Sequence, residues 1–174
     1  MNTAVETVPA VGISFADLLR YNESETIKWR TWLEKQAPEI LDIPFGDAAK
    51  RMGNVRDMLW HIFIVEWVYA CVLNGEPFGG WDQFARGTIG ELFAIGDQAR
   101  AALGTYVARA TEADISKSQT LSGGGITITG TARKFLAHAF FHSLRHWAQL
   151  ATVLRQHGYQ TDWQHDFVLS DVIE

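Results

Sequence analysis

Three of the six histidines in the sequence, His138, His142 and His146, are spaced four residues apart. On an α-helix, a step of four residues turns about 40° and climbs about 6 Å, so the three imidazoles form one slowly drifting stripe. Two imidazoles at positions i and i+4 can bind the same transition-metal ion, which is the basis of helical zinc sites. The spacing therefore favours a metal site. The alternative is one buried histidine that forms an internal hydrogen bond, with the other two incidental.

The residues that share the face of His142 support an inward orientation of the stripe. Phe135, Gln149 and Val153 all lie within about 20° of His142 on a helical projection. Two of these three residues are apolar. The histidines are therefore expected to point toward the protein interior.

A fourth histidine, His61, lies on the apolar face of another predicted helix, together with Ile64, Val65 and Val68. It too is expected to point inward. An isolated inward histidine is more often structural than catalytic. Asp57, one turn earlier, is a candidate acceptor for the second ring nitrogen of His61, or simply an acidic residue near a helix start.

The helices that would position these residues can be recognised from capping residues and apolar periodicity. Four are expected, over Ser14 to Pro38, Asn54 to Asn74, Asp82 to about Thr111, and Thr131 to His157, where Gly158 follows as the cap. The connections are a crossing segment over 38–53 with a short turn near 47–52, and a β-hairpin within 115–130 that turns at Gly123–Gly125. Residues 1–12 form a loose lead-in and residues 159–174 a C-terminal strap. The predicted fold is all-α, a four-helix bundle of a single domain over residues 1–174, with a small β-hairpin between helices three and four.

Composition and charge exclude several classes of protein. The net charge of −5 and the lack of a Lys/Arg cluster argue against a nucleic-acid partner. No apolar run reaches the roughly 18 residues that a membrane span needs, and the start lacks the pattern of a signal peptide. The single cysteine, Cys71, excludes an internal disulfide, fits a reducing compartment and is interpreted as a packing residue. We therefore expect a cytoplasmic protein that does not bind a membrane.

The face of the fourth helix opposite the histidines is also apolar. It comprises Ala137, Phe140, Leu144, Ala148 and Ala151, within an arc of about 100°. An apolar face must be covered by another surface, and alanines permit close approach. The pattern predicts a homodimer through helix four. The alternative is that the strap or the hairpin covers this face within one chain.

Two of these helices carry motifs that resemble the DinB-like family, also known as the DinB/YfiT group, whose members are regarded as metalloenzymes. The family has a helix-two histidine in a context like Leu-x-His-Ile, matched here by Leu59-Trp-His61-Ile62. Its fourth-helix motif, His-x-x-x-His-Arg-Gly-Gln, is matched by His142-Ser-Leu-Arg-His146-Trp-Ala-Gln149, and the closing Leu-Arg-x-x-Gly by Leu154 to Gly158. Trp147-Ala148 departs from the family's Arg-Gly, at positions that point away from the histidine face. Glu66 in helix two and Asp166-Phe167 in the tail also fit the family pattern.

The resemblance implies a four-helix bundle with His61, His142 and His146 as ligands of a divalent ion, often zinc or nickel, and His138 outside the ligand set. Three neutral imidazoles leave coordination positions open, as in catalytic sites. The ion would lower the pKa of what binds there. Water would give hydrolysis, whereas the thiol of a low-molecular-weight cofactor would give transfer to an electrophile.

We therefore expect a metal-dependent enzyme acting on a small-molecule substrate. Thiol transfer is slightly favoured, because the sequence offers no general base other than His138 that can be placed beside the ion. The first alternative is hydrolysis. The second is a non-enzymatic binding or stress-response bundle, in which the metal only holds two helices together.

Overall fold

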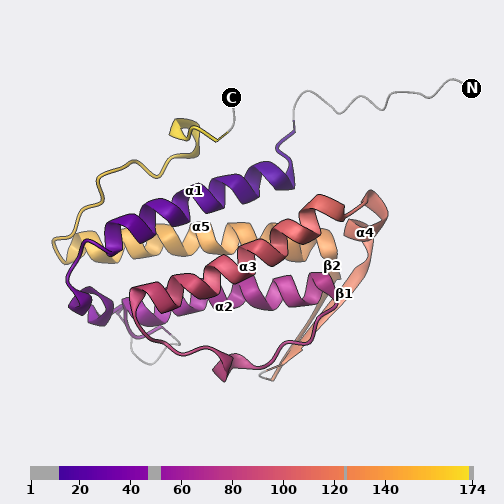
Figure 1. Ribbon diagram of the computed structural model, residues 1–174, viewed down its shortest axis with the longest axis horizontal. Helices are drawn as coiled ribbons and strands as arrows, with labels where there is room; N and C mark the ends of the chain where they lie inside the picture. Colours follow the sequence, from indigo (N-terminus) through magenta and orange to yellow (C-terminus); the bar gives the residue numbers. More distant parts are fainter. Residues whose placement is uncertain (1–11, 47–51, 124, 173–174) are drawn as a thin grey trace, which may run out of the picture.

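The computed structural model describes residues 12–46, 52–123 and 125–172. Four long helices dominate the structure (Figure 1), namely α1 (Phe15–Leu33), α2 (Val55–Asn74), α3 (Ile89–Arg109) and α5 (Ala132–Gln156). Each begins where the side chain of a preceding Ser, Thr or Asn accepts a hydrogen bond from a backbone N–H of the first turn. Helix α2 ends at Gly75, whose φ of 71° is the left-handed conformation that glycine adopts readily.

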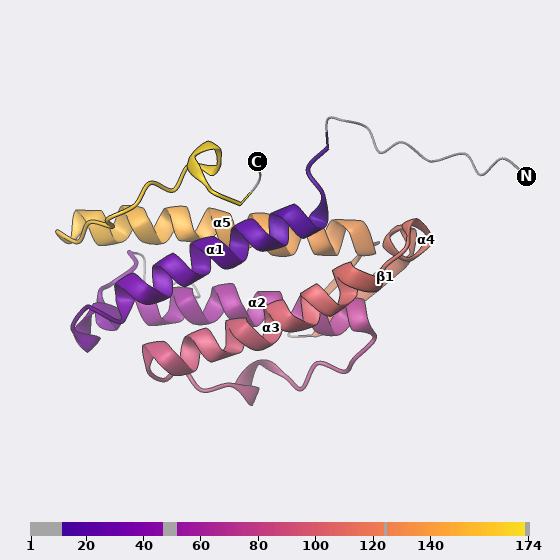
Figure 2. The ribbon, with the colours of Figure 1, turned by 45° about the horizontal axis from the view of Figure 1, so that its top comes forward.

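The four long helices form a bundle in which α2 and α1 each pack against both α3 and α5. Helices α1 and α2 therefore lie diagonally across the bundle from each other, as the two views show (Figures 1 and 2). Helices α2 and α3 run in the same direction. The start of α2 meets the start of α3, because Arg56 donates to the carbonyl of Gly87, and the ends meet where Asn74 donates to the carbonyl of Ala102. Residues 75–88 return along the whole bundle to connect them (Figure 1).

Short elements complete the chain. They are the 3-10 turns η1 (Pro38–Asp42), η2 (Trp81–Gln83) and η3 (Phe167–Leu169), the single-turn α4 (Glu112–Ser116), and the antiparallel strands β1 (Ser118–Gly123) and β2 (Ile126–Thr131). The hairpin contacts both α2 and α5. It therefore lies over the seam between the two helices that carry the histidines.

The expected fold class, an all-α four-helix bundle with a small hairpin before the last helix, is confirmed. The expected start of the third helix at Asp82 is wrong. Asp82 lies in a 3-10 turn, and α3 begins after Thr88, whose hydroxyl and backbone N–H form a reciprocal pair of bonds with Glu91. The turn expected near 47–52 falls almost wholly outside the described residues. None of the described helices combines the length and apolar character that crossing a membrane requires.

Gly96, one of the three glycines in α3, allows close packing of α3 on α2. A Cβ placed on it would lie 2.5 Å from a ring carbon of Phe63, a distance that only a displaced ring would permit. The glycine therefore has a packing role, and the helix continues through it.

The apolar face of α5 is partly buried within its own chain, in contrast to the expectation that a second copy covers it. Phe140 was expected to face a second copy, yet it is buried within its own chain, in a core cluster with Leu19 of α1 and Leu103 of α3. Leu144 is half-buried, in a groove bordered by His165, Asp166 and Phe167 of the tail. The tail thus covers part of this face within one chain. The homodimer itself stays a prediction.

Candidate metal centre

The structure brings His61 of α2 together with His142 and His146 of α5. One ring nitrogen from each lies within 4.8 Å of the others. The Nε2 atom of His142 is 3.1 Å from Nε2 of His61 and 3.1 Å from Nε2 of His146. Two nitrogens that bind one ion at about 2.0–2.1 Å are roughly 2.9–3.4 Å apart. The two measured separations therefore match those of ligands that share an ion.

The orientation of His146 is fixed by Gln149, one turn later on α5. Nδ1 of His146 is 2.6 Å from the side-chain oxygen of Gln149, which can only accept a hydrogen bond. Nδ1 therefore carries the proton, and the lone pair of Nε2 points into the cluster. A partner of this kind on the outer nitrogen is typical of metal-binding histidines.

Burial keeps the imidazoles of α5 neutral. It lowers the pKa of His142 to about 2, and the neighbouring His146 and His61 act in the same direction. Burial also lowers the pKa of His146, which the bond to Gln149 opposes. Only neutral imidazole has the lone pair that binds a metal ion. Three neutral imidazoles are a ligand set suited to zinc, nickel, copper or iron(II).

His138 lies one turn before His142 but outside the cluster of three. Its ring centroid is 5.5 Å from that of His142 and 5.5 Å from that of Tyr69. The side chain of His138 is exposed, so the inward orientation expected from the sequence is wrong for this residue, and partial desolvation still lowers its pKa. His138 is therefore a neutral imidazole next to the cluster, able to accept a proton.

Asp57 lies in the first turn of α2, which is the second of the two places considered for it in the sequence. Its carboxylate accepts a hydrogen bond from the backbone N–H of Gly53 and forms an ion pair with Arg86. Asp57 thus holds the connection between α2 and α3.

The cluster opens into a pocket of about 640 Å³. His61, His138 and His142 form one part of its lining, and apolar side chains form most of the rest. The residues that come from other segments are Trp81 and Arg86 of the α2–α3 connection, and Leu121, Gly123 and Ile128 of the hairpin. The pocket therefore gives the histidines access to a small molecule.

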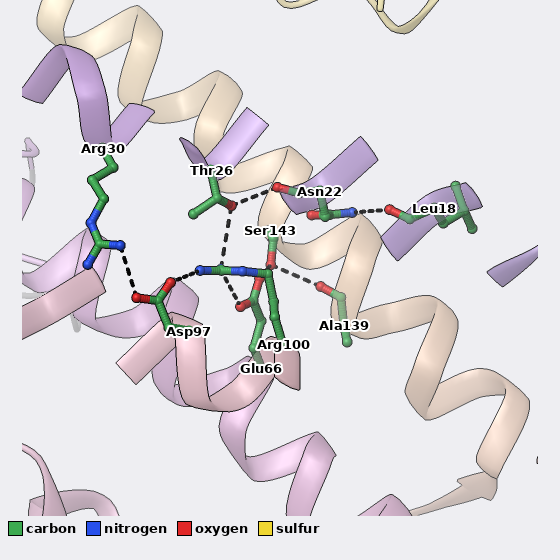
Figure 3. A network of polar contacts seen from close by, with 9 residues as sticks. All are labelled: Leu18, Asn22, Thr26, Arg30, Glu66, Asp97, Arg100, Ala139 and Ser143. Carbon is green, nitrogen blue, oxygen red and sulfur yellow. Dashed lines mark hydrogen bonds and ion pairs between the residues drawn. The ribbon is translucent and has the colours of Figure 1, made fainter. Parts of the chain in front are cut away.

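A buried polar network beside the cluster connects all four long helices (Figure 3). The hydroxyl of Ser143, adjacent to His142, donates to Glu66 of α2 at 2.6 Å. Glu66 is paired with Arg100 of α3 at 3.2 Å, and Arg100 also reaches the hydroxyl of Thr26 on α1 at 3.5 Å. Burial raises the pKa of the Glu66 carboxyl, while Arg100 and the Ser143 hydroxyl oppose this shift. The network holds α5 against α2 next to the cluster.

Trp147, which replaces the arginine of the family motif, packs among aromatic rings of the other three long helices. Its ring is 5.3 Å from that of Trp29 on α1, 5.8 Å from that of Phe63 on α2 and 6.3 Å from that of Phe93 on α3. It therefore points away from the histidines and into the core, as expected.

Sequence reasoning missed the pocket residues Trp60, Trp81, Arg86 and Arg145. Arg86 lies in the segment that the sequence assigns to the start of helix three, and Trp81 lies directly before that segment. Arg145 lay inside the histidine motif as an unassigned position. The signal that could have identified it is its place directly before His146 on a helix whose other basic residues lie near the ends.

Comparisons with known proteins agree with this fold. The family model described as DinB family matches residues 1–169. Among solved structures, the chain is similar to YfiT from Bacillus subtilis, described as a probable metal-dependent hydrolase with an unusual four-helix bundle topology. The match has a TM-score of 0.56 and 16% sequence identity, and covers 89% of this chain and 95% of that chain. At this identity the likeness concerns the fold alone. No curated protein sequence matches.

Proposed function

Since the chain belongs to the DinB family, we propose that it is a metal-dependent hydrolase whose divalent ion, zinc or nickel, is held by His61, His142 and His146. The observation that carries the proposal is the convergence of the three histidines, with two Nε2 separations of 3.1 Å at the edge of a pocket. The description of YfiT as a probable metal-dependent hydrolase agrees with it.

The ion would supply Lewis-acid chemistry, polarising a substrate carbonyl and lowering the pKa of a coordinated water or thiol. The chain's own residues have separate roles. Gln149 orients His146, and His138 lines the same pocket as a neutral imidazole that can accept a proton from the attacking water. The apolar lining excludes bulk water and binds the apolar part of a substrate.

A second candidate function is the transfer of a low-molecular-weight thiol to an electrophile. The observation that favours it is the absence of Asp and Glu from the pocket lining, as far as the described residues show. A hydrolase commonly uses a carboxylate or a histidine as its base, whereas thiol transfer needs none. The two functions therefore differ in whether His138 is required.

Metal content tests the ligand assignment. The purified protein and the single alanine variants of His61, His138, His142 and His146 should be analysed by mass spectrometry after equilibration with zinc or nickel. We expect one ion per chain in the wild type and in His138→Ala, and loss of the ion in the other three. A Gln149→Leu variant should bind the ion about 10- to 100-fold more weakly, since it lacks the acceptor that orients His146. Loss of metal from His138→Ala alone would show that the assignment is wrong.

Activity separates the three functional classes. The metal-loaded protein should cleave simple esters or amides, and His138→Ala should lose that activity while retaining its ion. Titration of the cobalt(II) protein with low-molecular-weight thiols is the matched test of thiol transfer. A new sulfur-to-metal charge-transfer band, absent from His142→Ala, together with no hydrolysis, would favour the transferase. If neither result is seen and metal removal only lowers the melting temperature, the ion is structural.

A further inference from the structure

The pocket at the histidine cluster is cationic although the whole chain is acidic. The net charge of the chain is −5. Two arginines, Arg86 and Arg145, line the pocket, and no aspartate or glutamate is among the described lining residues. Arginines at the wall of a pocket attract the negatively charged groups of small molecules.

Arg145 is the stronger candidate for binding an anion, because no carboxylate pairs with it in the described part of the chain. It contacts a histidine instead, with Nη2 3.4 Å from Nε2 of His146. A guanidinium group can donate to both oxygens of a carboxylate, phosphate or sulfonate group. An anion bound by Arg145 would therefore lie beside the histidine cluster.

Arg86 is held in position by Trp60, which also lines the pocket, and by Asp57. Its guanidinium carbon lies 4.2 Å from the ring centroid of Trp60, and one of its nitrogens pairs with Asp57. Asp57 offsets part of the charge of Arg86 but also fixes where the guanidinium lies. Arg86 is thus a second cation at the same pocket, and it should bind an anion more weakly than Arg145 because Asp57 offsets part of its charge.

Apart from the arginines and histidines, the lining of the pocket is mostly apolar. Val65 and Val68 of α2, Trp81 of the connection, and Leu121 and Ile128 of the hairpin contribute to it. Ile128 is 44% exposed, so its side chain is accessible to a ligand in the pocket. These side chains match a ligand that has an apolar part in addition to its charge.

We propose that Arg145, assisted by Arg86, recognises a negatively charged group on the substrate, so that the enzyme acts on small anionic compounds that also carry an apolar part. This proposal rests on the proposed function in one respect, namely that the bound anion is a substrate. The anion recognition itself follows from the two arginines and the pocket.

A pair of probes that differ in charge tests the proposal. Benzenesulfonate and methyl phenyl sulfone share the phenyl ring and two sulfonyl oxygens, and only the first is charged. Their affinities should be measured by titration calorimetry on the metal-loaded protein and on the protein treated with a chelator. The chelated sample separates binding by arginine from coordination to the ion. The variants are Arg145→Gln and Arg86→Gln, with Arg155→Gln as the matched control, because Arg155 is an exposed arginine of α5 outside the pocket.

We expect the wild type to bind benzenesulfonate at least about tenfold more tightly than the sulfone, both with and without metal. Arg145→Gln should lose about tenfold in affinity for the sulfonate, Arg86→Gln should lose less, and Arg155→Gln should be unchanged. Added salt should weaken the binding. Circular dichroism should show that all three variants are folded, since each arginine is exposed.

Three results would overturn the inference, namely no binding of benzenesulfonate, equal binding of the two probes, or an equal loss in Arg145→Gln and Arg155→Gln. Its failure differs from that of the proposed function. If the three histidines hold a metal and the probes bind equally, anion recognition alone fails. If the chain binds no metal but binds benzenesulfonate through Arg145, the metal-dependent function fails and anion recognition stands.

Discussion

At the scale of single residues, burial and one hydrogen bond prepare the histidines to act as ligands. Gln149 fixes the protonated nitrogen of His146, and burial keeps His142 neutral. A buried neutral imidazole lowers the free energy of unfolding at acidic pH, because the unfolded chain binds a proton more readily than the folded one. The cluster therefore links the free energy of folding to pH.

The sign of this linkage gives a prediction for the metal-free protein. The folded pKa of His142, about 2, lies below the value of 6.5 for a free ring. The unfolding free energy should therefore be unaffected above pH 6.5 and should fall as the pH decreases from 6.5 toward 2. Between pH 7.5 and 5.5, the wild type should lose about 1.4 kcal/mol more than His142→Gln, which cannot titrate. Urea unfolding of the chelator-treated proteins measures both values, and parallel pH profiles of the two proteins would contradict the prediction.

Sequence reasoning identified the residues of the cluster but not their surroundings. The four-residue spacing placed His142 and His146 on one face of a helix, because helical geometry is local. That His61 meets them depends on how α2 packs against α5, and this came only from the family resemblance. The spacing also left His138 without a position relative to the pocket. The structure places His138 on the pocket wall, beside His61 and His142.

At the scale of secondary-structure elements, the buried network fixes how α2, α3 and α5 pack together. Glu66 and Arg100 are both almost fully buried, with 3% and 7% of their side chains exposed. Removing one member of a buried ion pair leaves the other charge uncompensated in a poorly solvated environment. The pair is therefore more important to stability than an ion pair at the surface.

We predict that Arg100→Met will lower the unfolding free energy by about 3–5 kcal/mol. The matched control is Arg30→Met, which removes a guanidinium bonded at 2.9 Å to an exposed residue, Asp97, and should cost at most about 1 kcal/mol. The double variant Arg100→Met/Glu66→Gln should recover part of the loss, since no buried charge remains. Chemical denaturation measures all three. Similar values for Arg100→Met and Arg30→Met would show that the buried pair has no special role.

Helix boundaries were predictable where a capping residue and the apolar pattern agreed, and not elsewhere. Ser14, Asn54 and Thr131 each cap the helix that was expected to follow them. Asp82 has the type of a capping residue but lies in a 3-10 turn, because residues 75–88 must first return along the bundle before α3 can run parallel to α2. The path of residues 75–88 depends on how the helices pack, so the local sequence pattern does not predict it.

At the scale of the whole molecule, the pocket belongs to no single element. It needs α2, α5, the connection that contributes Trp81 and Arg86, and the hairpin that contributes Leu121 and Ile128. These segments are brought together only when the bundle has formed. This explains why the three histidines were accessible to sequence reasoning, whereas the arginines and apolar residues of the pocket were not.

The opposite side of α5 leads to the last prediction, the homodimer. Phe140 is buried in its own chain, but Phe141 is 58% exposed and lies with Leu144 on the groove bordered by the tail. Burying these two side chains against a second copy would contribute about 1.5–3 kcal/mol each, and a charge at the half-buried Leu144 would oppose it. We predict that the wild type is a dimer and Leu144→Glu a folded monomer. Thr105→Glu, on an exposed position of α3 diagonally across the bundle, should remain a dimer. Light scattering coupled to size-exclusion chromatography measures the mass of each, and a monomeric wild type would rule out the dimer.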